Sequence, residues 1–137
     1  HATCVFWPEL RAGVLITGAS GAGKSGLALR LIDRGWDLVA DDQVSLRTIN
    51  GAAWGSAPDA LLGKIAVAGV GVITMPYRAA CSLDLSIELE THPPRFPLDN
   101  STRSICGIAL PFIRINGQSA SAPLRVEQAL RHFAHDT

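Results

Sequence analysis

Long hydrophobic runs and a surplus of charge of either sign are both missing from this 137-residue chain. No stretch reaches 18 consecutive apolar residues, and the first residues lack the basic, apolar and small-residue order of a signal peptide. Lys and Arg together number 12, as do Asp and Glu, so the clustered positive charge that binds nucleic acid or an anionic membrane is not expected. We therefore expect a soluble cytoplasmic protein with no nucleic-acid partner and no membrane partner.

Paired cysteines are also missing. Cys4, Cys81 and Cys106 are odd in number, far apart and never in a CxxC pair, which argues against a disulfide framework or a zinc site and favours small buried side chains. With 47% apolar residues, the chain is long enough for one core and too short for two ordinary domains. We expect residues 1–137 to form a single domain. The chain opens on His1 rather than Met, which is compatible with a trimmed fragment of a longer protein.

Apolar periodicity predicts a strand, a helix and another strand in the first third of the chain. Residues 5–7 and 13–17 read as two strands joined by a turn. Residues 24–34 have helical spacing of apolar positions, and Gly35 follows where a left-handed cap is expected. The apolar run 36–40 then leads into Asp41 and Asp42. Strand, glycine loop, helix and strand predict a compact βαβ-type unit.

The rest of the chain predicts further strands and one more helix. Asn50-Gly51 favours a hairpin, and residues 65–73 suggest another strand and turn. Strict alternation over 83–90 predicts a half-exposed strand with its four aliphatic side chains on one face. Three prolines make 92–97 a loop, and a strand at 108–115 precedes a final helix that starts near Pro123.

The chemistry begins at residues 18–25, which match the P-loop (Walker A) pattern G-x-x-x-x-G-K-[ST] between a predicted strand and a predicted helix. In this position the loop amides and the helix N-terminus can point at phosphate oxygens. The glycines permit the backbone conformations and close approaches that the loop needs. Lys24 provides a point charge for the β and γ phosphates, and the Ser25 hydroxyl is a candidate Mg²⁺ ligand. The expected nucleotide-binding residues are Gly18, Ala19, Ser20, Gly21, Ala22, Gly23, Lys24 and Ser25.

Two acids follow the strand that comes after the predicted P-loop helix. Phosphoryl transfer needs an anionic group near Mg²⁺ and, for transfer to a hydroxyl, a base near the acceptor. Asp41 and Asp42 are suited to these tasks. Because successive strand side chains point to opposite faces, we expect only one of the two to reach the acceptor directly.

These residues resemble the catalytic domain of HPr kinase/phosphorylase, in the short form that consists of that domain alone. The resemblance is most specific in the P-loop together with the double aspartate, and it covers nearly the whole chain. The segments that carry it are residues 1–4, 18–35, 38–42, 56–58, 69–71 and 109–111.

The resemblance implies an ATP-dependent and Mg²⁺-dependent kinase for a serine of HPr, a phosphocarrier protein of the phosphotransferase system, with phosphorolysis as a reverse reaction. It implies an α/β fold like that of phosphoenolpyruvate carboxykinase, with a mixed sheet and flanking helices, and a hexameric assembly. By position, Asp42 corresponds to the catalytic base, Asp41 supports the metal or the loop, and His1 corresponds to an active-site histidine. Lys24 completes the expected catalytic set, and Ser25 with Asp41 the expected metal set.

The chain departs from the family pattern at two places. Ala66 and Ala68 replace the glutamate and arginine of a Glu-x-Arg-Gly arrangement, so a metal-binding carboxylate and a phosphate-neutralising cation are both lost. The basic glycine-containing segment tied to phosphorolysis is not recognisable at 115–118.

Several functions therefore stay open: an active HPr kinase, a kinase with a diverged protein substrate, or an ATP-binding regulatory module without transfer. A small-molecule P-loop kinase is a further alternative, for which Arg95 and Arg103 are the candidate lid arginines.

Overall fold

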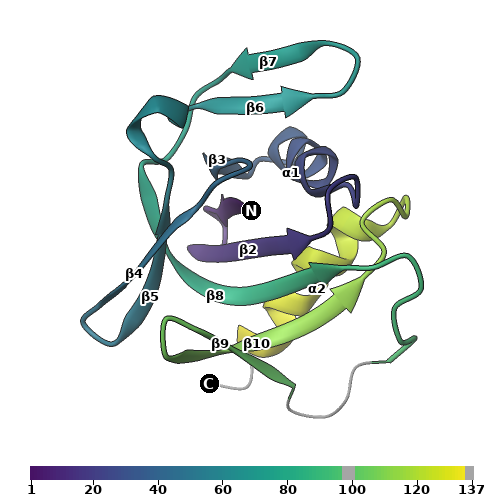
Figure 1. The fold of residues 1–137 in the computed structure, drawn as a ribbon. Helices are drawn as coiled ribbons and strands as arrows, with labels where there is room; N and C mark the ends of the chain where they lie inside the picture. The colour runs from purple at the N-terminus through teal and green to yellow at the C-terminus, as the bar shows by residue number, and fades with distance from the viewer. Residues whose placement is uncertain (97–100, 135–137) are drawn as a thin grey trace.

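A computed structural model of the chain describes residues 1–96 and 101–134. It contains a mixed β-sheet with two α-helices packed on one face (Figure 1). The strands are β1 (Thr3–Trp7), β2 (Ala12–Gly18), β3 (Asp37–Ala40), β4 (Ser45–Ile49), β5 (Ala52–Ser56), β6 (Lys64–Val67), β7 (Gly71–Thr74), β8 (Ala80–Leu89), β9 (Thr102–Ile105) and β10 (Ile108–Ile115). The helices are α1 (Lys24–Asp33), α2 (Ala122–Ala134) and the short 3₁₀ helix η1 (Asp59–Leu61).

The main sheet has the strand order β3-β1-β2-β8-β10-β9, and the β4–β5 hairpin joins it by pairing β5 with β8. Strands β2, β8 and β10 are parallel, whereas β1 runs antiparallel to both β2 and β3. The carboxyl ends of β2, β3, β8 and β10 therefore lie at the same edge as the amino end of β1. Strands β6 and β7 form a separate two-stranded ribbon.

The central strands are buried on both faces. Val14 and Ile16 of β2 pack into the cluster under the two helices, whereas Leu15 between them packs into a second cluster on the other face. This second cluster also contains buried side chains of the β4–β5 hairpin and of β9. A strand covered on both faces reads as a continuous apolar run, which explains the composition of residues 13–17.

The predicted βαβ unit is confirmed in its elements, but its layout is different. Strands β2 and β3 are parallel and flank α1 in the sequence, as expected, and Gly35 has a left-handed φ of 99° just past the helix. Strand β1, however, lies between them in the sheet. The periodicity of a strand shows which of its faces is buried, but not which neighbours it pairs with.

The prediction for residues 83–90 is partly wrong. Leu85, Ile87 and Leu89 pack under the helices, but Leu83 packs on the opposite face of the sheet. The reason is a register shift, in which Gly13 pairs with Leu83 while Val14 pairs with Leu85, so the residue between them is extra. Of the polar side chains, Asp84 is exposed and Glu88 partly exposed, as predicted, whereas Ser86 is fully buried.

Several smaller predictions can be compared with the structure. The β4–β5 turn has positive φ at Asn50 and Gly51, as expected of this dipeptide. Residues 92–96 form a loop, and Pro97 lies outside the described residues. The final helix is confirmed, whereas β9 was not predicted. No helix in the described residues combines the length and apolar character needed to cross a bilayer.

The expectation of buried cysteines is correct at two positions and wrong at the third. Cys4 and Cys81 are buried with their sulfurs 3.6 Å apart. Their hydrogen bond, together with burial, raises the pKa of the Cys4 thiol well above its ordinary value. Cys106 is exposed, because it occupies the turn between β9 and β10 with a φ of 50°.

Candidate active site

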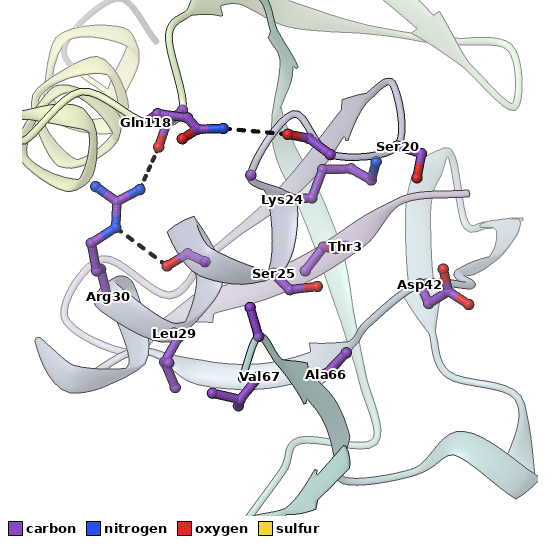
Figure 2. Close-up of a pocket in the computed structure, with 15 residues that line it drawn as sticks. Thr3, Ser20, Lys24, Ser25, Leu29, Arg30, Asp42, Ala66, Val67 and Gln118 are labelled. Carbon is purple, nitrogen blue, oxygen red and sulfur yellow. Dashed lines mark hydrogen bonds between the residues drawn. The ribbon is translucent and has the colours of Figure 1, made fainter. Parts of the chain in front are cut away.

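The P-loop joins the end of β2 to the start of α1 at the edge of the sheet where the four strands end (Figure 2). Gly18, Gly21 and Gly23 have φ values of 153°, 83° and 98°, a region that side chains other than glycine rarely occupy. Gly23 lies immediately before the first residue of α1. The backbone of the loop therefore continues directly into the N-terminal end of α1, where the helix dipole favours anions.

Lys24 lies across its own loop. Its Nζ donates to the Gly18 carbonyl at 2.7 Å and to the Ala19 carbonyl at 3.1 Å. The ammonium group is thus held at the mouth of the loop by neutral acceptors. A phosphate group would be a stronger acceptor for it than these carbonyls.

Asp41 connects three separate parts of the chain. Its Oδ1 accepts hydrogen bonds from the Thr3 hydroxyl at 3.0 Å and from the Ser25 hydroxyl at 2.8 Å, and its Oδ2 accepts the Ala66 backbone N–H at 3.0 Å. The residue is only 4% exposed. Because Ser25 donates its proton to Asp41, the lone pairs of its oxygen remain for another partner, such as a cation.

Asp42 faces the opposite way, with 68% of its side chain exposed. Its φ of 69° is left-handed, and its carbonyl accepts the N–H of Ala2, which fixes this turn. Its Oδ1 lies 3.5 Å from Nδ1 of His1. The two aspartates therefore point in different directions, and of the two it is Asp42 that is open to a group arriving from solvent. The reason is not strand alternation, because β3 ends at Ala40 and Asp42 lies in a left-handed turn.

A cavity of about 680 Å³ lies over the P-loop. Figure 2 shows Lys24 and Ser25 near its centre, Asp42 on one side, and Arg30 and Gln118 on the other. The residues that line it are Thr3, Ser20, Gly21, Gly23, Lys24, Ser25, Gly26, Leu29, Arg30, Asp42, Ala66, Val67, Ala68, Gly117 and Gln118. Its size is in the range of ligand pockets for small molecules and cofactors.

Sequence reasoning missed several lining residues, and three of them have polar side chains. Thr3, Arg30 and Gln118 belong to β1, to α1 and to the loop after β10. Thr3 and Arg30 lie in segments that carry the family resemblance, but no motif gave them a role, and only the fold brings the three segments to one edge of the sheet. Arg103, in contrast, lies in β9 and donates to the Thr17 hydroxyl at 2.7 Å, so the alternative that places it in a lid is not supported.

Ala66 and Ala68 both line the cavity. The Ala66 backbone N–H holds Asp41, but its methyl side chain adds neither a ligand nor a charge. Within residues 1–96 and 101–134, no group of three or more His, Cys, Asp or Glu side chains is arranged to hold a metal ion. The Ser25 hydroxyl oxygen, whose lone pairs are not used in its bond to Asp41, is a candidate metal ligand here.

A family model described as the HPr Serine kinase C-terminal domain matches residues 5–134 of this chain. The chain belongs to this family. HPr kinase/phosphorylase of Azoarcus sp. strain BH72 is 38% identical over 125 residues, covering 81% of this chain and 40% of that protein. The protein of the same name from Bordetella pertussis is 38% identical over 144 residues, covering 93% of this chain and 46% of that protein.

A solved structure, the Hpr(Ser) kinase/phosphatase from Coxiella burnetii, has the same fold. It superposes with a TM-score of 0.83 at 32% sequence identity, covering 99% of this chain and 90% of that chain. This similarity confirms the expected mixed sheet with flanking helices. The chain spans less than half the length of the two curated relatives.

Proposed function

We propose that the chain is an ATP-dependent and Mg²⁺-dependent protein-serine kinase that acts on HPr or a related phosphocarrier protein. The observation that carries the proposal is the arrangement of the two aspartates at one P-loop. Asp41 holds Ser25 through a 2.8 Å hydrogen bond, while Asp42 is exposed on the same cavity. Asp41 would thereby support the metal, and Asp42 would transfer the proton. Membership of the HPr kinase family supplies the substrate class.

The phosphates of ATP would lie along residues 18–25. The loop amides and the N-terminus of α1 would bind the phosphate oxygens, and Lys24 would exchange its two loop carbonyls for them. The nucleoside would occupy the part of the cavity beyond Gly26, which extends to Leu29 and Val67. In this arrangement the terminal phosphate would lie toward Asp42.

Ser25 would hold Mg²⁺, and Asp41 would serve the metal by orienting the Ser25 hydroxyl. All the hydrogen bonds described for the Asp41 carboxylate tie it to the protein, which favours this indirect role. Such a donor set fits Mg²⁺, which keeps several waters and binds through a few protein oxygens and substrate phosphates. When bound, the ion neutralises charge that develops on the phosphates.

Asp42 would act as the base. It accepts the proton of the substrate serine while the serine oxygen attacks the γ-phosphorus, and the bond from that phosphorus to the β–γ bridging oxygen breaks to release ADP. In phosphorolysis, an oxygen of inorganic phosphate would attack the phosphorus of phosphoserine. The bond from that phosphorus to the serine oxygen would break, Asp42 would return the proton to this oxygen, and pyrophosphate would leave. His1, 3.5 Å from Asp42, would steady its carboxylate.

We further propose a single cytoplasmic domain that assembles into a homo-oligomer.

The test is incubation of the protein with radiolabelled ATP, Mg²⁺ and purified HPr, followed by mapping of the modified residue. We expect label on a serine of HPr, and none when Mg²⁺ is removed with a chelator. Tight ATP binding with no labelled HPr would overturn the kinase proposal for this substrate.

A regulatory ATP-binding module is the second candidate, and two side chains in β6 and in the turn that follows it favour this reading. Ala66 and Ala68 line the cavity beside Ser25, where the family carries a carboxylate and a cation. A site that binds ATP through the P-loop but cannot stabilise the transferring group would bind without turnover. ATP binding that persists with no transfer to any phosphocarrier protein would support this candidate.

A further inference from the structure

The loop after β10 lies directly against the P-loop. We call residues 116–119 the clamp loop. The Gln118 side-chain amide donates to the Gly21 carbonyl at 3.3 Å, and its methylene group lies 3.5 Å from the position that a Cβ on Gly23 would occupy. Gln118 therefore touches the P-loop at two of its glycines, from the side away from Asp42 (Figure 2).

Arg30 anchors the clamp loop to α1. Its guanidinium donates to the Ser119 carbonyl at 2.9 Å and also to the Gly117 carbonyl, while its Nε donates to Gly26 in its own helix at 3.3 Å. A planar guanidinium can satisfy several acceptors in one fixed geometry, which a lysine ammonium cannot reproduce. The two clamp-loop carbonyls are thus held by the same helix that begins at the P-loop.

The clamp loop is held from its other side as well. The Asn116 amide donates to the Thr91 carbonyl at 3.2 Å, in the loop that follows β8. A Cβ on Gly117 would lie 2.6 Å from a methyl carbon of Leu89 and 3.2 Å from the Ala22 carbonyl oxygen, so the backbone passes through a space that fits only glycine without displacement. The position of Gln118 is therefore well determined.

We infer that Gln118 and Arg30 are positioning residues for the nucleotide: the clamp loop holds the P-loop open in its phosphate-binding shape. The inference rests on the proposed function for the identity of the ligand. The Gly21–Ala22 peptide is held at both ends, because its carbonyl accepts from Gln118 and its N–H donates to the Ala19 carbonyl at 3.0 Å. With this peptide fixed, the backbone that leads into Gly23 and Lys24, which both line the cavity, keeps its conformation. A loop that is already ordered loses less entropy when it binds a ligand.

The first test needs no nucleotide. Amide hydrogen exchange of peptides spanning residues 18–25 is compared for the ligand-free wild type, Gln118→Ala, Arg30→Ala and the control Arg47→Ala, whose side chain is exposed on β4. We expect faster exchange in the first two variants only. Exchange equal to wild type in Gln118→Ala and Arg30→Ala would overturn the clamp.

The second test measures ATP affinity by calorimetry. In Gln118→Glu the carboxylate cannot donate to Gly21 and repels phosphate, so we expect a Kd about tenfold higher. Gln118→Lys restores a donor and should bind as tightly as wild type or more tightly. Gln128→Glu adds the same charge on the exposed face of α2 and should have no effect. Melting temperatures should be equal across the Gln118 variants, because that side chain is exposed.

The outcomes separate the two proposals. If the wild type binds no ATP, the proposed function is overturned. The amide hydrogen exchange of residues 18–25 still tests whether the clamp loop orders the P-loop, because it needs no nucleotide. If the wild type binds ATP and both Gln118→Glu and Gln118→Lys have the same Kd for ATP as the wild type, the positioning role is overturned. With HPr as acceptor, a positioning role also requires that Gln118→Glu raises the KM for ATP while kcat at saturating ATP stays within about twofold.

Discussion

Asp41 and Asp42 are neighbours with the same side chain, yet their surroundings give them different chemistry. Three hydrogen bonds and burial tie Asp41 to the protein, whereas Asp42 projects from a left-handed turn into solvent. Asp tolerates this backbone conformation better than most residues. Asp42 is thus accessible to the hydroxyl group of a substrate, whereas the carboxylate oxygens of Asp41 are already occupied by three donors of the protein.

Replacing Asp42 by Asn should separate ATP binding from phosphate transfer. The amide keeps the size of the side chain but cannot take the serine proton, so we expect the Kd for ATP to change by less than about twofold and transfer to HPr to fall by about a hundredfold or more. Calorimetry and a phosphotransfer assay measure the two quantities. Asp33→Asn, at the exposed end of α1, is the matched control. Wild-type turnover in Asp42→Asn would remove Asp42 from the role of base.

Replacing Lys24 by Ala should abolish tight ATP binding. Lys24 is the ammonium at the mouth of the P-loop, 2.7 Å from the Gly18 carbonyl, and its loss leaves the phosphate charge without the cation that the loop provides. We expect the Kd for ATP in Mg²⁺ to rise by about a hundredfold, by calorimetric titration. Lys64→Ala, on the exposed side of β6, should bind like wild type. An unchanged Kd in Lys24→Ala would contradict the assignment of the phosphate site.

At the scale of elements, the β6–β7 ribbon lies outside the main sheet but completes the site. Its residue 66 contacts Asp41 through the backbone, so the contact does not depend on the side chain at that position. The tip of the ribbon exposes Val70 and Val72, at 70% and 68%. Ile65 of the ribbon is fully buried in the cluster under the helices, so substitutions there should affect stability. Substitutions at the exposed and cavity-lining positions of the ribbon are expected to change chemistry more than stability.

Restoring a carboxylate and a cation on this ribbon tests whether their loss limits the reaction. The double variant Ala66→Glu with Ala68→Arg keeps the backbone N–H that bonds Asp41 and adds a Mg²⁺ ligand and a positive charge beside the phosphates. We expect Mg²⁺-dependent transfer to HPr to rise by about tenfold, measured over a Mg²⁺ titration. Each single variant and Ala60→Glu, on η1 away from the cavity, are the controls. No gain in the double variant would favour the regulatory module.

At the scale of the whole molecule, one buried carboxylate joins the two helices to the sheet. Glu127 of α2 accepts hydrogen bonds from Arg34 Nε at 3.0 Å and from the Trp36 indole at 3.0 Å, and Arg34 adds a second guanidinium contact at 2.6 Å. Trp36 stacks on Trp7 of β1, with ring centroids 5.3 Å apart. Trp7 and Trp36 belong to the core cluster under the helices, so Glu127 and Arg34 are bonded at the edge of that cluster.

Glu127 should also make stability depend on pH. Burial alone would raise the pKa of Glu127, but the hydrogen bonds from Arg34 and Trp36 and the nearby positive charges outweigh it and lower this pKa. The stabilisation is thus complete above the unfolded pKa of about 4.3 and is lost as pH falls through the lower folded pKa. Glu127→Gln should lower the free energy of unfolding at pH 7 by about 2 kcal/mol.

Denaturant unfolding from pH 7 down to pH 3 measures both effects. The wild type should lose stability below about pH 4.3, and this loss should be smaller in Glu127→Gln, so the difference between the two proteins shrinks in acid. Asp59→Asn, exposed on η1, is the control. A difference that stays constant over the whole pH range would show that the Glu127 charge does not contribute.

The P-loop, its two flanking elements and the double aspartate could be predicted because their signals are local. A left-handed backbone at Gly21 and Gly23 and the helix that follows depend on residues within a few positions of each other. The same holds for the turn at Asn50-Gly51. The resemblance to the HPr kinase family rests on these local segments, and the family model confirms it.

Only the tertiary structure decided which segments meet at the P-loop. Inserting β1 between β2 and β3 brings Thr3 and His1 to the two aspartates, and the parallel pairing of β8 and β10 brings Gln118 to Gly21. Residues such as Arg30 and Gln118 have no local signal, because their partners lie far away in the sequence. Strand pairing is set by the burial of the whole core, whereas a turn or a helix start is set by the conformational preferences of a few neighbouring residues.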